Sequence, residues 1–147
     1  MIRRLGPGDL EQVEDLFNTP EVFESIKDDV MQVPGDIDIP GLLAHPKVYF
    51  MTYDDKGYGL FIPKNRRVYY VHVFAKKEHR DRGLVDRARK VIGYIYDNTG
   101  CEKLLGFIPI KNKPSIAFAA MVGFRQIGPF HAPGGDEMIV EHGPEDL

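Results

Sequence analysis

The segment 71–85, with the sequence VHVFAKKEHRDRGLV, constrains the fold of this chain more than any other stretch. Its first part belongs to a β-branched and aromatic run, residues 68–75, which is typical of a buried strand. A short basic loop follows, and the pattern then predicts a helix that opens at Gly83. A loop that leads from a strand into a helix N-terminus gathers backbone N–H groups around an anion. The run Arg80-Asp81-Arg82-Gly83 fits the R-x-x-G form of a pyrophosphate loop.

A second signal lies about thirty residues further along the chain. The helix from Gly83 ends near Asn98 and buries a stripe of Leu84, Ala88, Val91, Ile92 and Ile95. Residues 103–110 are nearly all apolar, as a central parallel strand requires. Asn112 or Lys113 then starts a short helix with Pro114 in its first turn, and Gly123 closes it before Phe124.

The rest of the chain predicts strands and two helices around this centre. A short strand covers residues 2–5, and Asp9 is expected to cap the first helix. A second helix starts at Pro20 and ends near Asp29. Hairpins are predicted over residues 48–53 with 58–63 and over 124–130 with 137–141. Residues 30–46, rich in proline and glycine, predict a long loop that either shapes a binding site or connects over the sheet edge.

Length and charge limit the classes of function. A chain of 147 residues predicts one domain, residues 1–147. The net charge of −3 argues against general nucleic-acid binding, so the basic residues near Arg80 suit a local anion or a solvated helix face. No apolar run approaches a membrane span of roughly 18 residues. Cys101 is the only cysteine, which indicates a reducing, cytoplasmic setting, and the five histidines lack metal-ligand spacing.

The order strand, R-x-x-G, helix, strand, N-x-x-S helix and Gly123-Phe124 resembles the Gcn5-related N-acetyltransferase (GNAT) superfamily. The resemblance covers nearly the whole chain and is strongest over residues 68–124. It implies an α/β fold with a mixed, mostly antiparallel sheet of about seven strands and helices on both faces. It also implies acetyl-coenzyme A as the co-substrate, with strand 68–75 splayed from strand 103–110 to admit the pantetheine arm.

The resemblance also implies which residues hold the cofactor. They lie on the splayed strand, on the loop with the start of its helix, and at the start of the later helix: Val73, Ala75, Arg80, Asp81, Arg82, Gly83, Leu84, Val85, Asn112 and Ser115. Val85 departs from the family pattern, because it stands where the family has glycine or alanine. Asn112 has a second interpretation as a helix N-cap, and both roles can hold together.

The catalytic residues are less well defined. The family often has a tyrosine, the general acid, where this chain has Ala119. Strand 68–75 offers Tyr69, Tyr70 and His72 but no carboxylate. Tyr70 and His72 share one face of the strand and Tyr69 lies on the other. His72 is therefore a candidate base or a core histidine.

Glu21 and Glu24, on the second helix, are further candidates for the acceptor side or are simply solvated. The first functional hypothesis is an N-acetyltransferase that moves acetyl from acetyl-coenzyme A to a primary amine by direct attack. The second is a catalytically degenerate binding or structural domain, since Ala119 and Val85 depart from the pattern. The chain is similar in its overall look to small bacteriophage-encoded members, some of them assembly or virion proteins. The acceptor amine and a homodimer stay open.

Overall fold

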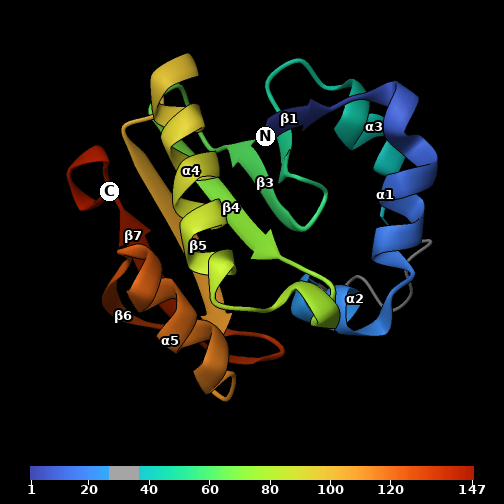
Figure 1. Ribbon diagram of the computed structural model, residues 1–147. Coiled ribbons are helices and arrows are strands. Elements are labelled where there is room, and N and C mark those ends of the chain that lie inside the picture. The colour runs from blue at the N-terminus through green and yellow to red at the C-terminus, as the bar shows by residue number, and fades with distance from the viewer. Residues whose placement is uncertain (27–36) are drawn as a thin grey trace.

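The computed structural model describes residues 1–26 and 37–147, and these form one seven-stranded sheet (Figure 1). The strand order is β1-β2-β3-β4-β5-β7-β6. The strands are β1 (Ile2–Leu5), β2 (Tyr49–Tyr53), β3 (Gly57–Pro63), β4 (Val68–Phe74), β5 (Lys103–Pro109), β6 (Arg125–Ala132) and β7 (Gly135–His142). Only β4 and β5 run parallel, and every other neighbouring pair is antiparallel. The predicted mixed, mostly antiparallel sheet is confirmed.

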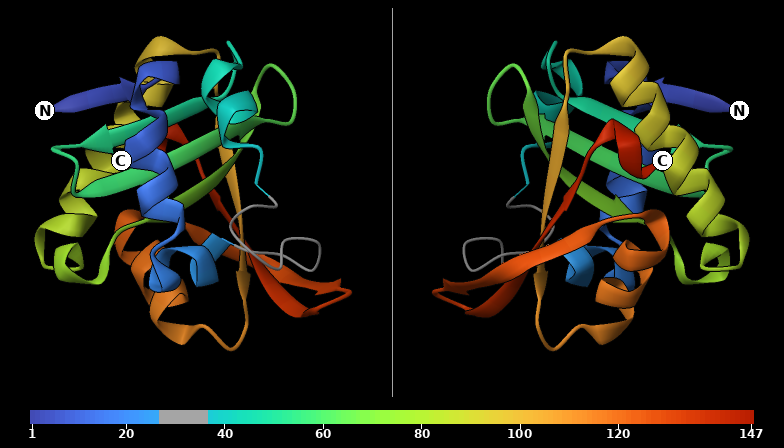
Figure 2. Two further views of the ribbon diagram at one scale, coloured as in Figure 1. Left: turned by 90° about the vertical axis from the view of Figure 1, so that its right-hand side faces the viewer. Right: turned by 90° about the vertical axis from the view of Figure 1, so that its left-hand side faces the viewer.

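Helices cover both faces of the sheet, as Figure 2 shows from two opposite sides. One face carries α1 (Leu10–Phe17), α2 (Pro20–Ile26) and α3 (Ile39–Ala44). The other carries α4 (Gly83–Asn98) and α5 (Lys113–Val122). The predicted helices on both faces are therefore present.

Each face has its own hydrophobic core, because successive strand residues point to opposite sides. Phe50 and Leu60 pack with Phe74 beneath α1, α2 and α3. Their chain neighbours Met51 and Phe61 pack beneath α4. The two cores fix the orientation of β4 and thus the side to which each of its residues points.

Part of the segment predicted to be a long loop is helical. Helix α3 begins after Asp38, whose side chain accepts a hydrogen bond from the Gly41 N–H at 3.1 Å. Pro40 sits in the first turn, where its missing N–H costs nothing. Proline and glycine therefore mark a helix start here, so the loop prediction was wrong for residues 39–44. Residues 30–36, and the predicted end of the second helix near Asp29, lie outside the described residues.

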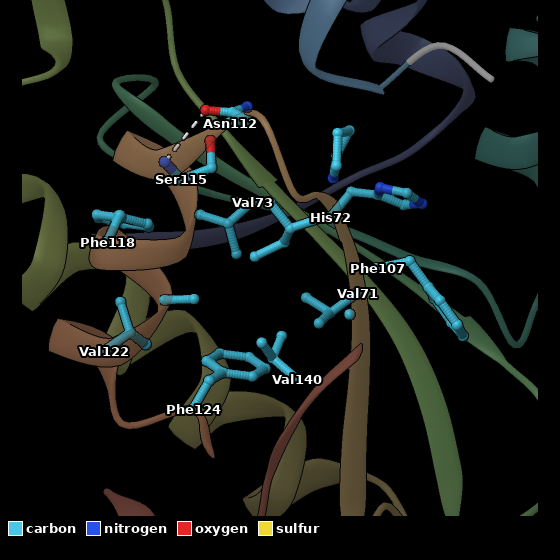
Figure 3. Close-up of a pocket in the computed structure, with 14 residues that line it drawn as sticks. Val71, His72, Val73, Phe107, Asn112, Ser115, Phe118, Val122, Phe124 and Val140 are labelled. Atoms are coloured by element: carbon cyan, nitrogen blue, oxygen red, sulfur yellow. Dashed lines mark hydrogen bonds between the residues drawn. The ribbon is translucent and has the colours of Figure 1, made fainter. Parts of the chain in front are cut away.

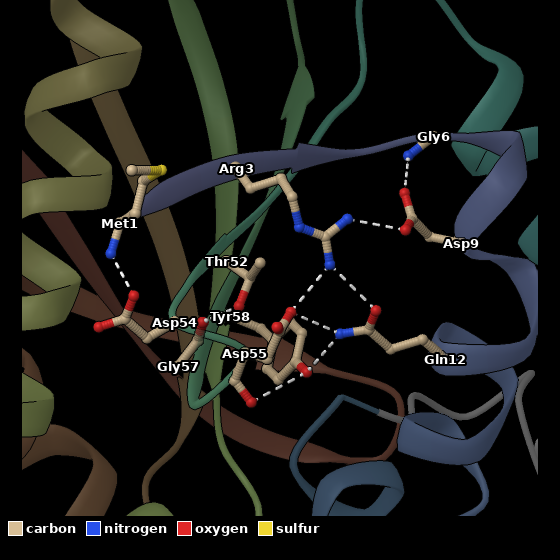
Figure 4. Close-up of polar contacts among 10 residues, drawn as sticks. All are labelled: Met1, Arg3, Gly6, Asp9, Gln12, Thr52, Asp54, Asp55, Gly57 and Tyr58. Atoms are coloured by element: carbon tan, nitrogen blue, oxygen red, sulfur yellow. Dashed lines mark hydrogen bonds and ion pairs between the residues drawn. The ribbon is translucent and has the colours of Figure 1, made fainter.

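Asp9 occupies the N-cap position of α1, as predicted, but its side chain makes no capping hydrogen bond to that helix. Its carboxylate instead accepts from the Gly6 N–H at 2.8 Å and from the Arg3 guanidinium at 2.7 Å (Figure 4). These two donors lower the pKa of Asp9. Arg3 also donates to Asp55 at 2.8 Å and to Gln12 at 3.1 Å. The network joins β1 to α1 and to the turn between β2 and β3.

His142, at the end of β7, is fully buried beside α4. The Tyr96 hydroxyl lies 2.8 Å from its Nδ1 and donates to the His142 carbonyl at 3.0 Å. Its Nε2 is buried without a hydrogen-bond partner among the described residues. Burial lowers the pKa of His142, so the folded protein holds this ring neutral.

We expect His142 to make stability fall as the pH falls from 7 to 5. The unfolded histidine titrates near a pKa of about 6.5 and binds a proton that the folded ring refuses. His142→Gln stays neutral throughout. The stability advantage of the wild type over this variant should therefore shrink at pH 5, as measured by urea unfolding at both pH values. An advantage that stays constant or grows would show that the buried ring is not the titrating group.

Candidate functional site

The two parallel strands separate partway along their length. The ladder between β4 and β5 runs from Val68↔Lys103 to Tyr70↔Leu105. Beyond that point β4 stays paired with β3 as far as Phe74, and β5 stays paired with β7 as far as Pro109. The splay predicted between these strands is confirmed.

The separation leaves backbone polar groups of β4 facing a gap. The Val68 carbonyl accepts from the Lys64 N–H at 2.9 Å, so Val68 directs its backbone toward β3. Alternation along the strand then directs the backbone of Val73 toward β5, where the ladder has already ended. Backbone groups in such a position need a partner from outside the sheet.

A cavity of about 100 Å³ lies at this gap, and the side chains of its lining residues project from both faces of the sheet (Figure 3). On the side of α5 it is lined by Val73, Phe118 and Ala119. On the opposite side, where α1, α2 and α3 lie, it is lined by His72 and Phe107. Residues of both faces of the sheet therefore border the cavity.

A larger hollow of about 860 Å³ adjoins the gap beyond the end of β4. The two cavities share Val73, Asn112, Ser115 and Phe118. Nine of the ten predicted cofactor residues line the hollow: Val73, Ala75, Arg80, Asp81, Arg82, Leu84, Val85, Asn112 and Ser115. Its volume falls within the range of ligand sites, roughly 300–1,000 Å³. The structure thus brings together residues that the sequence placed in three separate segments.

Arg80 braces the basic loop. Its Nε donates to the Ala75 carbonyl at 3.0 Å, and its Nη2 donates to the Glu21 carbonyl at 3.1 Å. The Glu21 carboxylate accepts from the Lys77 N–H at 3.3 Å, and this hydrogen bond contributes to the lowered pKa of Glu21. These bonds tie the loop to α2, so Arg80 shapes the wall of the hollow as well as adding positive charge.

Asp81 occupies the start of α4. Its Oδ1 accepts from the Gly83 N–H at 2.9 Å and from Arg87 Nη2 at 2.9 Å. The Arg87 guanidinium and the Gly83 N–H lower the pKa of Asp81. The Asp81 carbonyl also accepts from the Leu84 N–H at 3.1 Å. The loop therefore holds its own anion at the helix N-terminus, and the first two N–H groups of α4 are already bonded.

Asn112 has two predicted roles, as the N-cap of α5 and as a contact of the cofactor. Its Oδ1 accepts from the Ser115 N–H at 3.2 Å, so the N-cap prediction is confirmed. Asn112 and Ser115 also line both cavities, and their contact with a cofactor stays a prediction. Val85 lines the hollow and packs partly against the core beneath α4.

The three catalytic candidates have different surroundings. His72 lines the gap, and Tyr70 lies on the same face with its ring centroid 5.8 Å from that of Phe107. Tyr69 is not brought to the gap, since it lies in the core beneath α4, where burial raises its pKa. A catalytic role for Tyr69 therefore has no support from its position. Among the described residues no group of His, Cys, Asp and Glu gathers to hold a metal ion.

Sequence reasoning missed the wall on the side of β5 and β7. Gly106 and Phe107 of β5 and Val140 of β7 line the gap. A Cβ on Gly106 would lie 3.0 Å from Val140 Cγ2, so a glycine lets β5 and β7 pack closely here. The glycine that interrupts the apolar run LLGFI was the signal available in the sequence.

The fold matches those of solved acetyltransferases at low sequence identity. Spermidine N-acetyltransferase from Vibrio cholerae, in complex with coenzyme A and spermine, gives a TM-score of 0.79 at 14% identity over 99% of this chain and 96% of that chain. Aminoglycoside acetyltransferase AAC(6')-Ib, with coenzyme A and kanamycin, gives 0.75 at 12% identity over 99% and 95%.

A GNAT-family acetyltransferase from Bacillus anthracis gives a TM-score of 0.74 at 18% identity over 98% of this chain and 94% of that chain. No family model matches the sequence, and no curated protein sequence matches it. The likeness establishes that this chain has the GNAT fold, as the resemblance of its motifs implied.

Replacing Gly83 by valine should weaken coenzyme A binding at least tenfold, or about 1.4 kcal/mol. A Cβ at this position would lie 2.6 Å from Arg87 Nη1 and 3.2 Å from Asp81 Oδ1, so the paired Arg87 and Asp81 side chains must shift. Gly93→Val is the matched control in the same helix, because a Cβ there meets only Leu147 at 3.7 Å. Calorimetric titration compares the two. Equal affinity of both variants for coenzyme A would show that the loop is not part of the binding site.

Proposed function

We propose that this protein transfers an acetyl group from acetyl-coenzyme A to a primary amine. The observation that carries the proposal is the gap between β4 and β5, which is bordered by residues of both faces and adjoins the hollow beside the basic loop. Such a gap has room for a narrow thioester arm, and its edge carries backbone groups of Val73 that need partners. The folds it resembles include structures with coenzyme A bound.

The cofactor would lie on the side of α4 and α5. Its pyrophosphate would face the loop of Arg80 and Arg82, where charge-assisted hydrogen bonds suit phosphate. Its pantetheine amides would pair with the β4 backbone near Val73, and its acyl end would reach the gap beside Ala119. A backbone N–H of β4 would polarise the thioester carbonyl.

The acceptor amine would approach from the opposite face, on which His72 lies. The neutral amine attacks the thioester carbonyl carbon to form the C–N bond. The carbon–sulfur bond then breaks and coenzyme A leaves as a thiolate that must be protonated. We assign His72, at the mouth of the gap, as the candidate base for the amine. Ala119 cannot donate a proton, so water would protonate the thiolate.

The related structures indicate the class of reaction more closely than they indicate the acceptor. One is a spermidine acetyltransferase with spermine and another an aminoglycoside acetyltransferase with kanamycin, and both acceptors carry amines. No observation favours the non-catalytic alternative or a bacteriophage source.

We place the protein in the cytoplasm, where its only cysteine would stay reduced. Cys101 is buried, and burial raises the pKa of its thiol to about 11. None of the helices among the described residues is long and apolar enough to cross a membrane.

Titration with acetyl-coenzyme A should show micromolar binding, and turnover with an amine should release free thiol. Thiol release is measured with 2-phenylethylamine, spermidine and kanamycin as acceptors. His72→Gln should lower kcat and leave cofactor affinity unchanged, because the side chain lies on the acceptor face. Absence of both binding and turnover in the wild type would contradict the proposed function.

Introducing the missing acid should raise the rate. Ala119→Tyr places a phenol on α5 at the wall of the gap, and general acid catalysis is typically worth about 10²–10⁴-fold. Because thiolate is a good leaving group, we expect a gain near the lower end of that range. Ala119→Phe is the control of equal size without a hydroxyl. A similar rate for both variants would show that no proton donor was missing.

A further inference from the structure

Three aromatic rings form a row across the sheet beside the gap. The centroid of Tyr70 on β4 lies 5.8 Å from that of Phe107 on β5. The centroid of Phe107 lies 5.8 Å from that of Phe130 on β6, in an edge-to-face arrangement. We call Tyr70, Phe107 and Phe130 the ring row. Both spacings fall in the range of favourable aromatic pairs.

Among the described residues, neither cluster of buried core residues includes a member of the ring row, and Phe130 is 44% exposed. A glycine makes room for the contact between β5 and β6. Phe107 pairs with Ile139, which pairs in turn with Gly128, so no side chain on Gly128 blocks Phe130 from leaning toward Phe107. Phe130 is exposed, and Tyr70 and Phe107 are half-buried, so the row offers partly exposed aromatic surface to a ligand.

The ring row begins at the reaction point. Phe107 belongs both to the row and to the wall of the gap. Alternation along β4 directs Tyr70 to the same face as His72, away from α4 and α5. A molecule that lies on the row would therefore have one end at His72 and at the gap.

We propose that the ring row binds the body of the acceptor and that this acceptor is a primary amine carried on an aromatic ring. The inference rests on the proposed function and specifies its substrate class. An aromatic body would stack or pack edge-on along Phe107 and Phe130, while a short arm carries the amine to His72. The row thus acts as a determinant of acceptor specificity, separate from the cofactor side of the sheet.

The charges on this face do not by themselves choose between an aromatic amine and a polyamine. Glu141 pairs across the sheet with Leu105, two residues from Phe107, so it lies on the same face. Its carboxylate is matched by Arg125 at 3.2 Å and by Lys103 at 3.4 Å. Arg125 also pairs with Asp146 and lies 4.0 Å from Glu145, and Glu137 pairs across the sheet with Phe130 on the same face. The aromatic rings, rather than the charges, are therefore what favours an aromatic acceptor on this face.

The test compares acceptors and a variant that alters the ring row only. With acetyl-coenzyme A, 2-phenylethylamine should be acetylated with a higher kcat/KM than spermidine. Phe130→Leu should raise the KM for 2-phenylethylamine roughly 3- to 10-fold, since an aromatic pair is worth about 0.5–1.5 kcal/mol. The KM for acetyl-coenzyme A should not change. Ile127→Ala is the control, because it removes another exposed apolar side chain from β6.

Direct binding separates this inference from the proposed function. NMR titration of the protein saturated with coenzyme A should show 2-phenylethylamine shifting the resonances of Tyr70, Phe107 and Phe130. Such binding without any acetyl transfer would support the ring row and defeat the proposed function. Transfer to spermidine that Phe130→Leu leaves unchanged, with no binding of 2-phenylethylamine, would overturn the ring row and leave the proposed function standing.

Discussion

The hydrogen-bond ladder between β4 and β5 ends at Tyr70↔Leu105, and the candidate site depends on that ending. A buried backbone group left without a partner costs about 1–3 kcal/mol, so two central strands should pair along their whole length unless something holds them apart. Here each strand keeps its other neighbour, β3 for β4 and β7 for β5, so neither is free to close the gap. The two hydrophobic cores hold β4 from both faces, and their packing offsets the free-energy cost of the opening.

Helix α5 holds the opening on the cofactor side because both of its ends are fixed. Asn112 caps its start, and Gly123 ends it with a φ of 115° that favours glycine. A Cβ on Gly123 would lie 2.5 Å from the Asp146 carbonyl, so the chain near residue 146 confines this turn. Phe118 and Ala119 are thereby held over the gap. The wall that would contact the acyl group therefore belongs to a helix fixed at both ends, whereas the opposite side carries the ring row with the exposed Phe130.

Local patterns in the sequence predicted the elements that lie around the gap. The β-branched run of β4, the apolar stripe of α4 and the helix end at Gly123 are each determined by residues of one segment, so the sequence predicted them. Features that depend on contacts between several segments could not be predicted in this way. The Asp81 side chain at the Gly83 N–H, the ring contact between Phe107 and Phe130, and the burial of Tyr69 arise from tertiary packing. The helix α3 was missed because Pro40 and Gly41 also suit a loop.

The gap between β4 and β5 bears on the order of the chemistry. A cofactor on the side of α5 and an acceptor on the side of His72 would meet only within the gap, so neither must leave before the other binds. Transfer through a protein thioester would need a reactive thiol there, and the only cysteine, Cys101, is buried beneath α4 with a raised pKa. Asp81 would bear on the cofactor rather than on the acceptor, because a pyrophosphate that used the Gly83 N–H would have to displace a carboxylate held by Arg87. In the proposed arrangement cofactor affinity and acceptor choice would be set on opposite faces of the sheet, and a change on one face would leave the other intact.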